Sequence, residues 1–189
     1  EAGTVTIGGV DVSSITDRER RACIGCVEQQ FSRVPGTVLE QITLSDPNIT
    51  EDMALNAAKL AGIHDAVCAL PDGYATVCTD GLFSQGEWQL LSIARAAAAN
   101  PAVLLLDEIT AALDPEMVRE VLDVVLSLAK AGSTMVIVTH EMNFARAIAD
   151  RILFIENGAV VEQSDDPKAF FASPATDRAK AFLKSFDYE

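Results

Sequence analysis

Two short apolar runs near the middle of the chain each end abruptly at polar residues. Residues 102–106 read Ala-Val-Leu-Leu-Leu and are followed by the carboxylates Asp107 and Glu108. Residues 135–138 read Met-Val-Ile-Val and lead, after one threonine, to His140. Runs this short and rich in branched residues are typical of central strands in a parallel sheet that is covered on both faces. Ligands bind beyond the carboxyl ends of such strands, so the pattern predicts that Asp107, Glu108 and His140 lie at one site.

A helix is predicted between these two strands. Apolar residues recur at spacings of three and four from position 117 to 128, which indicates one buried stripe. Asp114 is placed to cap the N-terminus, Pro115 suits the first helical position, and Gly132 suits the end. Strand, helix and strand in this order predict a parallel β–α–β unit and an α/β fold.

The rest of the chain shows weaker patterns of short strands and helices. We expect a hairpin over 5–12, a helix over 17–21 capped by Thr16 or Asp17, a strand over 23–27, and helices beginning after Thr37, from 50 to 62, from 63 to 70 and from 87 to 99. Further on, we expect a helix over 141–150, a strand over 152–155, a tight turn at Asn157-Gly158, and helices after Asp166 and Pro174.

The composition describes a globular chain and excludes some functions. The 189 residues are 49% hydrophobic and 22% charged, with a formal net charge of −14. That charge argues against nucleic acid as a partner, since phosphate backbones attract clustered Lys and Arg. The sequence has no apolar run near the ~20 residues of a membrane helix and no visible signal peptide. If the protein serves a membrane, we expect it to do so through a partner.

Three possible metal or redox ligands are best interpreted as structural residues. Cys23 and Cys26 form a CxxC pair, but positions three apart on a strand face opposite sides, so we expect reduced core cysteines of a cytoplasmic protein rather than a zinc site. His64 is expected on a helix surface or at a cap, with no second ligand nearby.

The order of motifs along the chain resembles the ATP-binding cassette (ABC) ATPases. The residues Ile24-Gly-Cys-Val-Glu-Gln29 are similar to the strand that carries the Q-loop glutamine in that family. The apolar run ending in Asp107 resembles the Walker B motif, with Glu108 as the catalytic carboxylate. Residues 111–114 resemble the D-loop, and His140 the switch histidine.

The segment Leu82-Phe-Ser-Gln-Gly-Glu87 resembles the family signature L-S-G-G-Q, and the Ala94-Arg-Ala96 further along resembles its helix. Ser84 would offer an N-cap hydroxyl, and Gly86 would let an anion approach the free amides of the helix. Gln85 replaces the first glycine of the signature, and Glu87 replaces its glutamine. Ser84 and Glu87 also make a capping box, so Glu87 is expected to secure the helix. Trp88 is expected to be a packing residue.

The resemblance implies a fold class and a division into domains. The fold would be α/β, P-loop NTPase-like (RecA-like), with a mostly parallel sheet, a helical subdomain, and the N-terminal part of the core missing. Residues 1–30 and 96–163 would form the partial core, residues 31–95 the helical subdomain with the signature motif, and residues 164–189 the C-terminal helices.

The resemblance also implies a function, which is ATP binding and hydrolysis that power transmembrane transport at the cytoplasmic face of the cell membrane. ATP and Mg²⁺ would be the cofactors. Glu108, His140 and Gln29 would act in hydrolysis, and Asp107 and Gln29 would hold Mg²⁺ through water. Partners would be a second cassette, in a homodimer or heterodimer, and a transmembrane domain or subunit bound through the helical subdomain. Ser84, Gln85, Gly86 and Asp114 would contact nucleotide across the dimer.

One family motif is absent and leaves alternatives open. The sequence contains no Gly-Lys pair, and therefore no phosphate-binding P-loop of the form G-x-x-x-x-G-K-[ST]. We therefore expect a truncated chain, inactive by itself, although its parent would be an ATPase. A catalytically dead binding module and a non-transport ABC ATPase of DNA maintenance are the alternatives. Residues 50–73 resemble exporter cassettes, whereas residues 139–162 resemble ATPases of polar amino-acid importers, so the direction of transport stays open.

Overall fold

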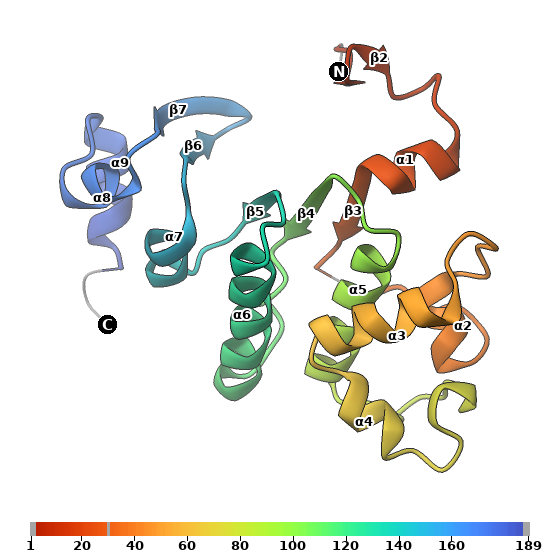
Figure 1. Cartoon of the computed structure of the whole chain (residues 1–189). Helices are drawn as coiled ribbons and strands as arrows, with labels where there is room; N and C mark the ends of the chain where they lie inside the picture. The colour runs from red at the N-terminus through yellow and green to blue at the C-terminus, as the bar shows by residue number, and fades with distance from the viewer. Residues whose placement is uncertain (1–2, 30, 187–189) are drawn as a thin grey trace. The chain divides into compact units, whose positions relative to one another are not determined.

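The computed structural model describes residues 3–29 and 31–186 (Figure 1). These residues form two compact units, one ending at Val138 and the other beginning at Thr139.

The first unit begins with a small hairpin and continues into a mixed helix and strand region. Its elements are β1 (Thr6–Ile7), β2 (Val10–Asp11), α1 (Asp17–Cys23), β3 (Ile24–Val27), α2 (Val38–Thr43), α3 (Glu51–Leu60), α4 (His64–Cys68), the 3₁₀ turn η1 (Gly73–Ala75), α5 (Gln85–Ala98), β4 (Val103–Asp107), α6 (Pro115–Lys130) and β5 (Met135–Val138). Strands β1 and β2 pair antiparallel, as expected for the N-terminal hairpin.

The strands β3, β4 and β5 form a parallel sheet with β4 in the centre (Figure 1). Val27 pairs with Leu106, and Asp107, the next residue, pairs with Val138. The carboxyl ends of all three strands therefore lie at one edge, which confirms the predicted β–α–β unit and the placement of Asp107 at that edge.

The sheet has two unequal faces. On the first, Val27, Leu104 and Leu106 are buried. There β3 packs so closely on α5 that a Cβ atom on Gly25 would lie 2.5 Å from the carbonyl oxygen of Ala96. On the second face, residues of all three strands are exposed or half-buried, with Val136 53% exposed. The prediction that both faces are covered holds for only one face in the part of the chain that the structure describes.

The helices begin where the capping residues predict. Thr16, Thr37 and Ser84 each accept a hydrogen bond from the backbone N–H three residues later, and a glutamate at that later position binds back to them. Such reciprocal capping boxes satisfy two backbone donors that a helix start would otherwise leave unpaired. Asp114 caps α6 with Pro115 at the first helical position, as predicted.

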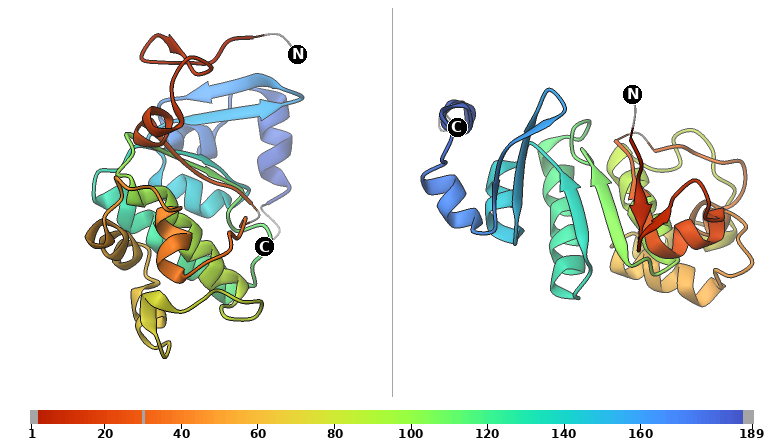
Figure 2. Two further views of the ribbon diagram at one scale, coloured as in Figure 1. Left: turned by 90° about the vertical axis from the view of Figure 1, so that its right-hand side faces the viewer. Right: turned by 90° about the horizontal axis from the view of Figure 1, so that it is seen from above.

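The second unit consists of a hairpin and three helices. Its elements are α7 (Met142–Ile148), β6 (Ile152–Glu156), β7 (Ala159–Ser164), α8 (Pro167–Ala172) and α9 (Asp177–Lys184). Asn157 and Gly158 both have positive φ, as a tight hairpin turn requires. The carboxylate of Glu162 accepts hydrogen bonds from the backbone N–H groups of Ala175 and Thr176, both at 2.8 Å, and so ties β7 to the start of α9. Figure 2 gives two further views of the ribbon.

The structure corrects several further expectations from the sequence. Cys23 and Cys26 are not core residues, since Cys23 is half-buried and Cys26 is exposed on the second face of the sheet. Cys23 is the last residue of α1 rather than part of β3, because the capping box at Thr16 starts a helix that runs two residues past the predicted end. The helix expected from Glu87 begins at Gln85, directly after its cap. His64 does have a possible ligand nearby, since the Sγ atom of Cys68 lies 3.6 Å from its Nε2 atom.

None of the helices among the described residues is both long enough and apolar enough to span a bilayer. All four cysteines are free thiols. The described residues contain no group of three or more His, Cys, Asp or Glu side chains arranged to hold a metal ion.

Candidate functional site

The candidate site in the first unit lies at the carboxyl edge of the sheet. Asp107 is the last residue of β4 and is exposed, and Glu108 follows it in a half-buried position. The N–H of Glu108 donates to the carbonyl oxygen of Val138 at 3.0 Å, and this bond joins the ends of β4 and β5. The two carboxylates therefore lie where the ends of β4 and β5 are joined by a hydrogen bond.

Glu108 has an unusual backbone conformation. Its φ is +47°, in the left-handed region that side chains other than glycine rarely adopt. Such a conformation is unfavourable by about 1–3 kcal/mol and persists where the surrounding structure determines it, often at functional sites. The hydrogen bond to Val138 and the following turn, in which the N–H of Ala111 donates to the carbonyl of Glu108 at 3.1 Å, determine it here.

Negative charge gathers at this edge. Burial raises the pKa of the Cys26 thiol above its usual value, and the nearby carboxylates of Glu28 and Asp107 raise it further. The ends of β3 and β4 thus bring Cys26, Glu28 and Asp107 close together. Gln29 follows Glu28 in an exposed position next to them. Carboxylate and amide oxygens are ligands that suit Mg²⁺, which commonly binds one or two protein carboxylates and completes its shell with water and phosphate.

Ser84 stands at the N-terminus of α5, a helix of fourteen residues. Its hydroxyl oxygen accepts from the N–H of Glu87 at 3.2 Å, and the Glu87 carboxylate accepts from the N–H of Ser84 at 2.7 Å. Glu87 therefore secures the helix, as expected. The Ser84 hydroxyl keeps its own hydrogen available as a donor to an anion, while the carboxylate of Glu87 places a negative charge beside the helix start. Gln85 is exposed in the first turn.

Gly86 and Asp114 have structural roles in addition to those expected from the motifs. A Cβ atom on Gly86 would lie 1.9 Å from the Cε atom of Met117, so this glycine lets α5 pack closely against α6. Asp114 accepts from the N–H of Met117 at 3.0 Å and caps α6. Contact of either residue with nucleotide stays a prediction.

His140 belongs to the second unit, two residues after the end of β5. Its Nε2 atom lies 3.9 Å from a carboxylate oxygen of Glu141, a contact that becomes an ion pair if the imidazole is protonated. A pocket of about 370 Å³ adjoins it, lined by residues of the second unit that include Arg146, Phe171 and Leu183. The structure thus places Asp107, Glu108 and Gln29 at one edge of the first unit, and His140 in the second.

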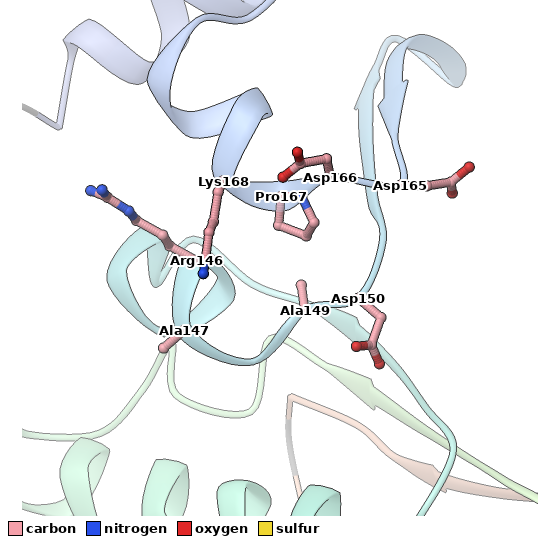
Figure 3. A pocket seen from close by; sticks show the side chains of 8 residues that line it. All are labelled: Arg146, Ala147, Ala149, Asp150, Asp165, Asp166, Pro167 and Lys168. Atoms are coloured by element: carbon pink, nitrogen blue, oxygen red, sulfur yellow. The ribbon is translucent and has the colours of Figure 1, made fainter.

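A second pocket of the second unit contains none of the predicted residues. It has a volume of about 480 Å³, and Figure 3 shows the side chains that line it, among them Arg146 and Lys168. The carboxylate of Asp165 points away and pairs with Arg151 at 3.1 Å, and Asp166 caps α8. We assign it no role in the candidate site.

Several residues that contact the segment after Gln29 were not predicted from the sequence. Arg95 is half-buried and binds the segment after Gln29, as does Gln41, which is fully buried. The match to Ala94-Arg-Ala96 pointed to Arg95 but did not show what it contacts. Trp88 packs between Phe31 and Phe83, as a packing residue should.

Comparisons with known proteins place these features in a family. A family described as "ABC transporter" matches residues 1–111. The glutamate transport ATP-binding protein GluA of Corynebacterium efficiens is 43% identical over 97% of this chain and 76% of its own length. The glutamine transport ATP-binding protein GlnQ of Bacillus subtilis is 41% identical, over 96% of this chain and 75% of its own. The glutamate/aspartate import ATP-binding protein GltL of Escherichia coli is 38% identical, over 97% and 76%.

Among solved structures, a bacterial Atm1-family ABC exporter with ATP bound matches all of this chain with a TM-score of 0.77 and 27% identity. The chain spans 32% of that exporter. The sequence relatives are thus named for amino-acid transport, whereas this structural neighbour is an exporter.

Proposed function

Because this chain belongs to the ABC transporter family and has its P-loop NTPase-like α/β fold, we propose that the carboxyl edge of the β3–β4–β5 sheet is its ATP-hydrolysing site. The ATP-binding subunits of this family hydrolyse ATP to drive transport. They dimerise and work with transmembrane components.

The observation that carries the assignment is the conformation of Glu108. Its left-handed backbone is held by hydrogen bonds at the end of the central strand, next to the exposed carboxylate of Asp107. Glu108 is the residue to orient or deprotonate the attacking water. Asp107 and Gln29 would hold Mg²⁺ through water, and the ion would neutralise charge on the phosphates. His140, two residues after β5, would contact the γ-phosphate.

Ser84, Gln85 and Gly86 would act on nucleotide held by a second cassette. The capping geometry leaves the Ser84 hydroxyl able to donate, and the positive end of α5 favours an anion. Asp114 would act across the same dimer. These roles require two copies of the cassette, in a homodimer or a heterodimer.

We further propose that the transported substrate is a polar amino acid. The three relatives above are named for transport of glutamate, glutamine or aspartate, at 38–43% identity. The transmembrane partner would bind through the helical subdomain, residues 31–95, at the cytoplasmic face of the membrane. Residues 1–30 and 96–163 would supply the core, and residues 164–189 the C-terminal helices.

The direct test uses Glu108→Gln in a version of the chain extended at its N-terminus by a phosphate-binding loop of the family type. We expect unchanged Mg-ATP binding by calorimetry and a loss of turnover by at least about 100-fold, since the amide cannot take the proton of the water. Glu116→Gln, an exposed carboxylate in the first turn of α6, is the control and should keep normal turnover. Equal turnover in Glu108→Gln and the parent would refute the assignment.

A polypeptide of the 189 residues alone supplies a second test. It lacks the amides and lysine of a P-loop, each worth about 1.5–3 kcal/mol as a charge-assisted contact. The loss of four such contacts is about 6–12 kcal/mol, enough to move a micromolar site beyond millimolar. We expect no saturable Mg-ATP binding below millimolar concentration. Tight binding would mean that the phosphates sit elsewhere.

A further inference from the structure

The segment Phe31–Val34 has no regular secondary structure, yet each of its residues is fastened to a helix. It begins two residues after Gln29 and leads toward α2. Exposed irregular segments usually have few fixed contacts and open easily. This segment has contacts at every residue, and most of them come from α5.

Arg95 makes the densest set of these contacts. Its Nη1 atom donates to the carbonyl oxygen of Ser32 at 2.8 Å, and its Nε atom donates to the carbonyl of Gln41 at 2.6 Å. Its Nη2 atom donates to the side-chain oxygen of Gln41 at 3.1 Å. The guanidinium also lies over the ring of Phe31, 4.2 Å from the ring centroid. One side chain thus joins the segment, α2 and α5.

The charge of Arg95 strengthens these bonds. Burial lowers the pKa of Arg95 to about 10, and the charge of Arg21 lowers it further. Because this pKa is still well above neutral pH, the guanidinium stays protonated there. Hydrogen bonds from a charged donor are roughly twice as strong as those between neutral groups. Its planar fork holds three acceptors at fixed angles, which the single ammonium of lysine cannot reproduce.

An aromatic stack fastens the same segment further along α5. The rings of Phe31 and Trp88 stack at 5.1 Å with 25° between their planes, and Phe83 meets Trp88 edge-on at 5.1 Å. The guanidinium of Arg33 lies 5.3 Å from the Trp88 ring and pairs with Asp80. Stacked rings and a cation over a ring attract one another, so these contacts add to the hydrogen bonds that hold the segment.

Further hydrogen bonds hold the backbone before Gln29, at Glu28, and after it, at Val34. The side-chain amide of Gln89, one residue after Trp88, donates to the carbonyl of Glu28 at 3.5 Å. The side chain of Gln41 accepts from the N–H of Val34 at 3.1 Å and donates to the carbonyl of the same residue. Residues before Gln29 are therefore held by α5, and residues after it by α5 and α2.

We propose that Arg95 is a positioning residue for Gln29: it clamps the segment Phe31–Val34 to α5, so that Gln29 and Ser84 keep a fixed relation within the cassette. The proposal rests on the assignment of Gln29 and Ser84 to ATP hydrolysis. Arg95 itself touches no reacting atom. It acts through Ser32 and Phe31, and the contacts of Trp88 support the same arrangement.

The only tryptophan in the sequence gives a direct measure of the clamp. Trp88 is 8% exposed, and the ring of Phe31 stacks on it. In Arg95→Met, which keeps the apolar stem but removes the donors, the segment should open. Acrylamide should then quench Trp88 emission at least about twofold more strongly than in the parent protein, because local opening admits solvent. Hydrogen exchange at the N–H of Val34 should accelerate at the same time.

Two further variants complete this experiment. Arg95→Lys keeps the charge and one donor, and should give quenching between the parent and Arg95→Met. Arg119→Met removes an exposed arginine from α6 and should leave quenching unchanged. Far-UV circular dichroism should be alike in all proteins. If Arg95→Met misfolds, Arg95→Lys makes the same comparison, because it leaves the ring of Phe31 on Trp88 in place. Quenching that stays at the parent level in these variants would overturn the clamp.

Kinetics of the extended, ATP-hydrolysing protein then test positioning. A displacement of the order of 1 Å at a reacting group lowers a rate by up to about 100-fold, so kcat should fall about 10- to 100-fold in Arg95→Met. KM for ATP should change less than about twofold, since uniform binding is unaffected. Normal kcat with increased quenching would show that the clamp exists but does not position Gln29.

An error in the assignment of the ATP site and an error in the role of Arg95 would give different results. If the assignment of the ATP site is wrong, Glu108→Gln will retain the turnover of the parent protein. If only the clamp is wrong, Glu108→Gln will lose turnover while Arg95→Met keeps both its kcat and its protected tryptophan.

Discussion

The two faces of the β3–β4–β5 sheet carry similar apolar side chains in different surroundings. On the first face Leu104 and Leu106 are buried, and α5 approaches so closely that Gly25 has no room for a Cβ atom. On the second face Val136 and Val138 are 53% and 45% exposed. An apolar side chain stabilises the fold through the area it removes from water, so the first face should account for most of the stability of this sheet.

The largest effect should come from truncating a leucine on the first face. Leu106→Ala leaves a cavity at a fully buried position and should lower the free energy of unfolding by about 2–5 kcal/mol. Leu105→Ala, the neighbouring residue on the second face, is the matched control. Because Leu105 is only half-buried, we expect its loss to be smaller than that of Leu106→Ala. Chemical denaturation measures both, and equal losses would contradict the comparison.

The next effect should come from adding one methyl group to the first face. In Gly25→Ala the new Cβ would meet the backbone carbonyl of Ala96 at 2.5 Å and the side chain of Leu104 at 2.8 Å. A backbone atom cannot move aside easily, so we expect a loss of about 1–3 kcal/mol. Cys26→Ala, one residue further on the second face, should have little effect. Thermal melting of the two variants compares them directly.

A smaller effect is expected at the start of the helix that covers the first face. Glu87→Ala removes one half of the capping box of α5 and should lower stability by about 0.5–2 kcal/mol. Glu87→Gln can accept the same hydrogen bond and should be nearly silent. In the extended protein, Glu87→Gln should keep or raise ATPase activity, because it removes a negative charge near phosphate. A large loss of activity in Glu87→Gln would reveal a role of the carboxylate beyond capping.

The smallest effect is expected on the second face. Val136→Thr keeps the shape of an exposed side chain and adds a hydroxyl that water can reach. Exposed substitutions of this kind usually change stability by less than about 0.5 kcal/mol. Val121→Thr, at a fully buried position of α6, is the contrasting variant and should be clearly destabilising, since its hydroxyl would be buried. A large loss in Val136→Thr would mean that the second face is covered in solution.

Local patterns predicted the elements of the fold well. Caps such as Thr37 and Asp114 start helices because a side-chain oxygen replaces a missing backbone acceptor, and this depends only on nearby residues. The turn at Asn157-Gly158 is equally local. Helix ends were less predictable: α1 continues to Cys23, which the pattern assigned to a strand.

Motif order predicted the candidate site but not its supports. Asp107 and Glu108 were found because two carboxylates after an apolar run are a recognisable pattern, and the sheet places them as expected. The clamp of Arg95 on Ser32 joins positions sixty-three residues apart, and nothing in either local sequence indicates it. The left-handed backbone of Glu108 likewise depends on the partner strand β5.

The sequence by itself therefore indicated the family and the order of strands and helices, and it predicted the residues of the candidate ATP site, because these depend on spacing and on local hydrogen bonding. Only the tertiary structure decided which face of the sheet is buried, what Gly25 and Gly86 pack against, and how Arg95 fastens the segment after Gln29 to α5. These depend on which distant parts of the chain meet, and close packing allows such contacts only where shapes and hydrogen-bonding groups match.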